Sequence, residues 1–87
     1  MDVLKKSDQQ EKFSYEKLAF SIGAANADTG EALDIELLLA EFQNIVADKE
    51  FITSGQIYVI VCGQLYAKGA LNTLKKYSEY KEIIRDP

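Results

Sequence analysis

The sequence contains no histidine and a single cysteine, Cys62, among its 87 residues. Without histidine, the usual general base near neutral pH is missing. One cysteine cannot form a disulfide within the chain, and without histidine it cannot build a cysteine–histidine metal cluster. Cys62 lies in an aliphatic run, which predicts a small core residue rather than a nucleophile. The sequence therefore predicts that the protein is not an enzyme, and it favours a reducing compartment.

Proline, glycine and long apolar runs are also scarce. With one proline, five glycines and 47% hydrophobic residues, the composition argues against an extended disordered chain. No apolar stretch approaches the ~18 residues that a membrane span requires. Residues 1–25 carry eight charges, which leaves no hydrophobic region of a signal peptide there. We expect one domain, residues 1–87, in the cytoplasm and without a membrane partner.

The charge is unevenly distributed along the chain. The net charge of −4 argues against direct binding of nucleic acid. Basic residues gather at the two ends, whereas residues 28–48 contain six acids and no base: Asp28, Glu31, Asp34, Glu36, Glu41 and Asp48. An anion site would bring the two ends together and leave the acidic middle facing elsewhere. The alternative is that the acidic middle is only a solvated face.

The first half of the chain predicts a hairpin and two helices. Residues 2–6 and 10–13 predict a small β-hairpin, whose turn lacks the glycine that favours tight hairpins. Ser14 is a good N-cap for a helix that ends near Asn26. A second helix is predicted from about Asp34 to Asp48, with this apolar stripe: Ile35, Leu38, Leu39, Phe42, Ile45 and Val46.

The second half is less clear. Residues 49–52 predict a connection, and Thr53 and Ser54 supply the next helix cap. The six apolar residues 57–62 fit either a buried strand or a helix that is buried on most sides. Gly69 separates this segment from a last helix that reaches Ile84.

The candidate chemistry lies where the hairpin meets the first helix. No glycine-rich nucleotide-binding loop is present, so a phosphate site would depend on lysines and a helix N-terminus. Lys5, Lys6 and Lys17 bracket this junction. Glu11 could accept a hydrogen bond from an exocyclic amino group or a ribose hydroxyl. The alternative is a set of solvated lysines on a polar hairpin.

The same segment resembles the opening signature of the ATP-cone, a nucleotide-binding regulatory domain. That signature runs Val-x-Lys-Arg-(Asp/Asn)-Gly, then Glu-x-Phe-(Asp/Ser), then Lys-Ile/Leu. The residues in register, with no gap, are Val3, Lys5, Glu11, Phe13, Ser14, Lys17 and Leu18. Residues 52–57 are similar to the start of the family's third helix, and residues 74–81 to the end of its fourth. The resemblance thus extends roughly from residue 3 to residue 82.

The resemblance implies an α+β, mainly α fold, in which an N-terminal β-hairpin packs on a four-helix bundle and residues 57–62 are helical. It implies allosteric binding of ATP or dATP, with or without Mg²⁺. The partner would be a second copy or a reductase-type protein, because family members occur in ribonucleotide reductases and in the repressor of their genes. The nucleotide-binding residues would be Val3, Lys5, Lys6, Glu11, Ser14, Lys17 and Thr53.

Lys6 and Asp8 depart from the family pattern in ways that bear on anion binding. Lys6 replaces the usual arginine, so a fork-shaped phosphate contact becomes a point charge. Asp8 replaces the usual glycine and adds a negative side chain to the hairpin turn. Both changes would weaken anion binding. The alternative function is therefore a small helical protein–protein interaction module with a degenerate nucleotide site.

Overall fold

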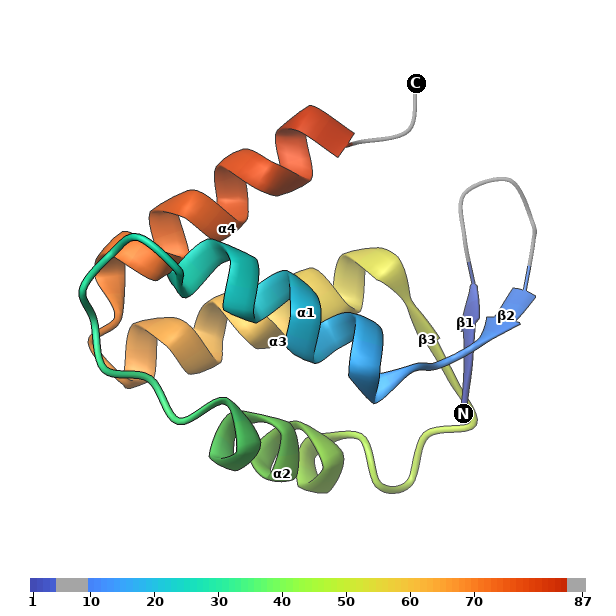
Figure 1. Ribbon diagram of the computed structural model, residues 1–87. Helices are drawn as coiled ribbons and strands as arrows, with labels where there is room; N and C mark the ends of the chain where they lie inside the picture. Colours follow the sequence, from blue (N-terminus) through green and yellow to red (C-terminus); the bar gives the residue numbers. More distant parts are fainter. Residues whose placement is uncertain (5–9, 85–87) are drawn as a thin grey trace.

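The computed structural model describes residues 1–4 and 10–84 (Figure 1). Side chains are described as far as Glu79. The fold is α+β and mainly helical, as predicted. In chain order, the elements are β1 (Asp2–Leu4), β2 (Gln10–Lys12), α1 (Tyr15–Asn26), α2 (Ile35–Ile45), β3 (Phe51–Thr53), α3 (Ser54–Ala67) and α4 (Leu71–Ile84). The predicted hairpin turn, which contains Asp8, lies outside the described residues, as do Lys5 and Lys6.

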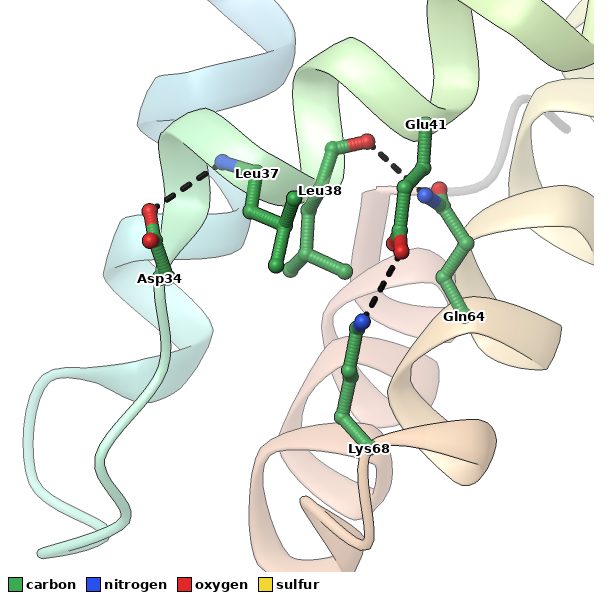
Figure 2. Close-up of polar contacts among 6 residues, drawn as sticks. All are labelled: Asp34, Leu37, Leu38, Glu41, Gln64 and Lys68. Atoms are coloured by element: carbon green, nitrogen blue, oxygen red, sulfur yellow. Dashed lines mark hydrogen bonds and ion pairs between the residues drawn. The ribbon is translucent and has the colours of Figure 1, made fainter.

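α1 and α3 begin at the caps that the sequence predicts, and α2 is capped by Asp34, the residue at which its predicted range begins. The side-chain oxygens of Ser14, Asp34 and Thr53 accept hydrogen bonds from the third residue of α1, α2 and α3, respectively. Figure 2 shows the α2 cap, in which the Asp34 carboxylate accepts from the Leu37 N–H at 3.1 Å. Residues 57–62 lie within α3, so the helical interpretation of this segment is confirmed.

The N-terminal strands belong to a three-stranded sheet of order β2-β1-β3. β1 pairs with β2 antiparallel, as the predicted hairpin requires, and with β3 parallel. The prediction of a connection over residues 49–52 is therefore wrong, because β3 begins at Phe51. A strand of three residues has little local signal. It exists here through its pairing with β1, which is distant in sequence.

The four predicted helices surround one hydrophobic core, although a regular four-helix bundle is not clearly shown. α2 and α4 lie on opposite sides of the pair formed by α1 and α3, and each of them packs on both members of that pair (Figure 1). The sheet lies at the end of the molecule where α1 and α3 begin. The largest fully buried side chains are Ile22, Leu38, Phe42, Ile52, Val61, Leu65 and Thr73.

Three apolar residues are more exposed than the sequence predicts. Ile45, assigned to the apolar stripe of α2, is 49% exposed, and α2 ends at this residue and not near Asp48. α3 has one open face, on which Val59 is 67% and Tyr66 71% exposed. The prediction that this helix is buried on most sides therefore fails along one stripe. Gly69, with a φ of 72°, follows the end of α3 in the left-handed conformation that glycine favours.

α2 is fastened to α3 by two polar contacts, both drawn in Figure 2. The buried Gln64 amide donates to the Leu38 carbonyl at 2.8 Å. Near the end of α3, the Lys68 ammonium lies 2.9 Å from the Glu41 carboxylate. The lysine from the basic C-terminal half thus neutralises an acid of the middle segment, and both groups have a structural role.

A second polar network fastens the loop after α1 to the start of α4. The Asn26 amide donates to the Thr29 hydroxyl, the Glu31 carbonyl and the Thr73 hydroxyl. The Glu31 carboxylate accepts from the backbone N–H groups of Asn72 and Thr73 at 3.0 and 2.8 Å, and from the Thr73 hydroxyl at 2.7 Å. Glu31 therefore caps α4 with a negative charge, which suits the positive end of a helix.

Candidate functional site

One set of paired residues crosses all three strands of the sheet. It includes two predicted site residues, Val3 on β1 and Glu11 on β2. Val3 is the register partner of Glu11 on β2 and of Ile52 on β3. Directly opposed residues project to the same face of a sheet. Val3 is 6% and Ile52 1% exposed, so this face packs toward the helices. The side chain of the half-buried Glu11 therefore projects from the inner face of the sheet.

Ser14 and Lys17 lie at the start of α1, directly after β2. The Lys17 backbone N–H donates to the Ser14 Oγ at 3.2 Å, so this oxygen accepts the capping bond. The Ser14 hydroxyl hydrogen can still be donated. The Lys17 side chain is exposed. The helix N-terminus and one ammonium group are thus close in sequence to Glu11.

Thr53 lies at the other end of the strands. It is the register partner of Leu4, the last described residue of β1 before Lys5 and Lys6. Its Oγ1 accepts from the Gln56 N–H at 3.0 Å, and the Gln56 side chain accepts from the Thr53 N–H at 2.9 Å. This capping box fixes the start of α3 and leaves the Thr53 hydroxyl hydrogen free for donation.

Within the part of the chain that the structure describes, the predicted site residues therefore lie toward both ends of the strands. β2 leads into α1 beside Asp2, whereas β3 leads into α3 beside Leu4. Asp2 and Leu4 are separated by two residue steps of a strand, or about 7 Å. An elongated ligand could reach both helix N-termini across this distance, whereas a single phosphate could not. Val3 belongs to the hydrophobic core and is almost fully buried.

Three aromatic rings support the junction between β2 and α1. Phe13 stacks on Phe42 of α2, with ring centroids 5.3 Å apart and planes 7° apart. Tyr15 lies edge-on to Phe13, with centroids 4.7 Å apart and an 85° angle between the planes. The sequence prediction includes Phe13 in the signature and Phe42 in the core but assigns no role to Tyr15. The aromatic side chain next to the cap is the signal that could have found it.

A separate hollow lies between α2 and α3. This open groove has a volume of about 560 Å³ and is lined by Glu41, Asn44, Ile45, Val59, Ile60, Gly63, Gln64, Ala67 and Lys68. Most of this surface is apolar. The one cation among the lining residues, Lys68, already contacts Glu41. The lining residues of the groove therefore lack the available positive charge that binding a polyphosphate requires.

The described residues contain no group of three or more histidine, cysteine, aspartate or glutamate side chains that could hold a metal ion. Within the same residues, no helix has the length and apolar character needed to cross a membrane.

These features define a small α+β domain in which a three-stranded sheet meets the N-termini of two helices and carries an inward-facing carboxylate. The family model of the ATP cone domain matches residues 1–85, essentially the whole chain, so this chain belongs to the ATP-cone family. A comparison with curated proteins gives no match. Membership of the family implies a regulatory, nucleotide-binding role rather than a catalytic one.

Proposed function

We propose that this chain is a single ATP-cone domain, residues 1–87, that binds ATP or dATP as an allosteric ligand beside its sheet. The observation that carries the proposal is the position of Glu11. It shares the inner face of the sheet with Val3 and Ile52, and only five residues separate it from Lys17 in a family that binds nucleotides. An acceptor and an ammonium so close in sequence suit a base or ribose and a phosphate chain.

Each proposed contact has a physical reason. The ammonium groups of Lys5, Lys6 and Lys17 would make charge-assisted hydrogen bonds to phosphate oxygens. The start of α1, capped by Ser14, adds partial positive charge. Glu11 would accept from the adenine amino group or a ribose hydroxyl, and the Thr53 hydroxyl would donate from the far end. Mg²⁺, where it takes part, would be bound through the phosphates.

The regulatory consequence would be a change in assembly. A nucleotide can shift an equilibrium between two assemblies only through its different affinity for the two states. We propose a second copy of the chain or a reductase-type protein as the partner, with no role for a membrane or for direct contact with nucleic acid. The cytoplasm, where ATP and dATP are available, is the proposed location.

A thermal-shift titration with ATP and dATP, with and without Mg²⁺, tests the proposal. Ligand at a hundredfold excess over its dissociation constant stabilises the folded state by ~2.7 kcal/mol. For a domain of this size, the melting temperature should rise by roughly ten degrees or more. GTP is the matched control, because it presents a carbonyl where adenine has its amino group. A melting curve that millimolar ATP and dATP leave unmoved would sink the proposal.

The second candidate is the interaction module with a degenerate nucleotide site. Two observations favour it: the exposed apolar stripe of α3, and the replacement of arginine and glycine by Lys6 and Asp8. It becomes the better explanation if neither nucleotide changes the melting temperature. A folded chain that associates with a partner equally well in the presence and absence of nucleotide would support it.

A further inference from the structure

Phe42 lies on α2, a helix that carries none of the proposed nucleotide contacts. Its ring is fully buried and stacks face to face on Phe13, with 5.3 Å between the centroids. Phe13 directly follows β2, and its backbone N–H donates to the Met1 carbonyl at 3.1 Å. The contact between the two rings therefore anchors the end of β2 on the core.

Tyr15 extends this contact to α1. Its ring lies edge-on to both phenylalanines, with centroid distances of 4.7 Å to Phe13 and 6.4 Å to Phe42. Edge-on and stacked arrangements are favourable for aromatic side chains. Ser14, the cap of α1, stands between Phe13 and Tyr15 in the sequence. Both neighbours of the cap are thus held against the same ring of α2.

The register of β2 decides where Glu11 points. β2 is a three-residue edge strand that pairs only with β1. Residues two apart on a strand project to the same face, so Phe13 and Glu11 are both directed inward. A slip of one residue would turn Glu11 to the solvent. A strand this short forms few backbone hydrogen bonds, and these alone resist a slip only weakly. A slip would also break the stacking of Phe13 on Phe42, so this stacking helps to hold the register.

We propose that Phe42 is a positioning residue for the nucleotide site, which fixes the register of β2 and the start of α1 without contacting the ligand. The inference rests on the proposed nucleotide-binding function. Through Phe13, Phe42 keeps Glu11 on the inner face. Through Tyr15, it sets the separation between Glu11 and Lys17.

The experiment compares Phe42→Leu with Tyr77→Leu. Tyr77 stacks on Tyr58 with centroids 5.7 Å apart and has a side-chain hydrogen bond with Ser21 in the middle of α1. The control therefore removes a similar ring contact and one hydrogen bond more, away from the β2–α1 junction. Calorimetric titration with ATP is done at a temperature at which circular dichroism shows both variants folded. Phe42→Leu should weaken ATP binding about tenfold and Tyr77→Leu by less than about twofold. If Phe42→Leu does not fold, Phe13→Leu is used in its place. It removes the same stacking contact, and Phe13 is only half-buried.

A double-mutant cycle separates positioning from general loosening of the fold. If Phe42 acts by orienting Glu11, the substitution Phe42→Leu should cost clearly less affinity in a Glu11→Gln background than in the wild type. Additive losses would overturn the inference, as would equal losses from Phe42→Leu and Tyr77→Leu. If the wild type and Phe42→Leu bind ATP equally tightly, the proposed function stands and only the positioning role is refuted. A wild type that binds neither ATP nor dATP would overturn both.

Discussion

The two ends of α1 are held in different ways. At its C-terminal end, the Asn26 amide donates to three oxygens, and the fully buried Thr73 hydroxyl joins it to Glu31. At its N-terminal end, aromatic rings and a strand of three residues hold the chain, and the Lys17 side chain is exposed. Polar groups whose hydrogen bonds are made within the protein stabilise its fold. A binding site instead needs groups that can still form hydrogen bonds or ion pairs with a ligand. Stability and affinity should therefore respond to changes at opposite ends of this helix.

The largest expected effect is on affinity, at the N-terminal end. Lys17→Ala removes a charge-assisted contact to phosphate and should weaken ATP binding by ~1.5–3 kcal/mol, measured by calorimetric titration. The free energy of unfolding without ligand should change little, because the side chain is exposed.

Lys75→Ala, at an exposed lysine of α4, is the matched control and should leave the affinity unchanged. Lys68 is unsuitable for this purpose, because its ammonium contacts Glu41. Equal losses from Lys17→Ala and Lys75→Ala would indicate general attraction of an anion to lysines in place of a site.

The C-terminal end should show the opposite result. Thr73→Val removes the buried hydroxyl that joins Asn26 to Glu31, and should lower the free energy of unfolding by ~1–3 kcal/mol in chemical denaturation. The affinity of the folded protein for ATP should remain that of the wild type. Ser78→Ala, which removes an exposed hydroxyl of α4, should change the stability by less than about 0.5 kcal/mol. A loss of affinity in Thr73→Val would mean that the two ends of α1 are coupled.

The helix starts and the hairpin could be predicted from local sequence, because local signals determine where helices begin. Ser14, Asp34 and Thr53 are short polar residues ahead of apolar periodic segments, and each caps the expected helix. The hairpin strands also lie within the predicted ranges. β3 could not be found this way, since three residues form a strand only when a partner from elsewhere in the chain reaches them.

The arrangement of the candidate site depended on the same long-range pairing. The sequence pattern selects Glu11, Lys17 and Thr53 as site residues, but the sheet register decides that Thr53 lies at the other end of the strands from Lys17. The acidic middle of the chain shows a similar limit. Asp34 caps α2 locally, whereas Glu31 caps α4 and Glu41 contacts Lys68 at long range, so three of its acids serve the fold. The last two have no local signal in the sequence, because neither partner is close to its acid along the chain.

The smallest expected effect concerns the pH dependence of stability at the C-terminal end. The hydrogen bond from the Thr73 side chain is the main cause that lowers the pKa of Glu31 below its ordinary value of 4.5; partial desolvation opposes it, and the Asn72 and Thr73 N–H groups add to it. A carboxyl group whose pKa is lower in the folded state stabilises the fold above its unfolded-state pKa. This stabilisation is lost as the pH falls below 4.5 and through the folded-state pKa. Glu31→Gln should therefore be less stable than the wild type near neutral pH, and the difference should shrink in acid. Denaturation without nucleotide at a series of pH values measures this difference. If the two stability curves run parallel through the acid range, Glu31 does not cap α4 through its charge, and the closed network at this end of α1 is weaker than its geometry indicates.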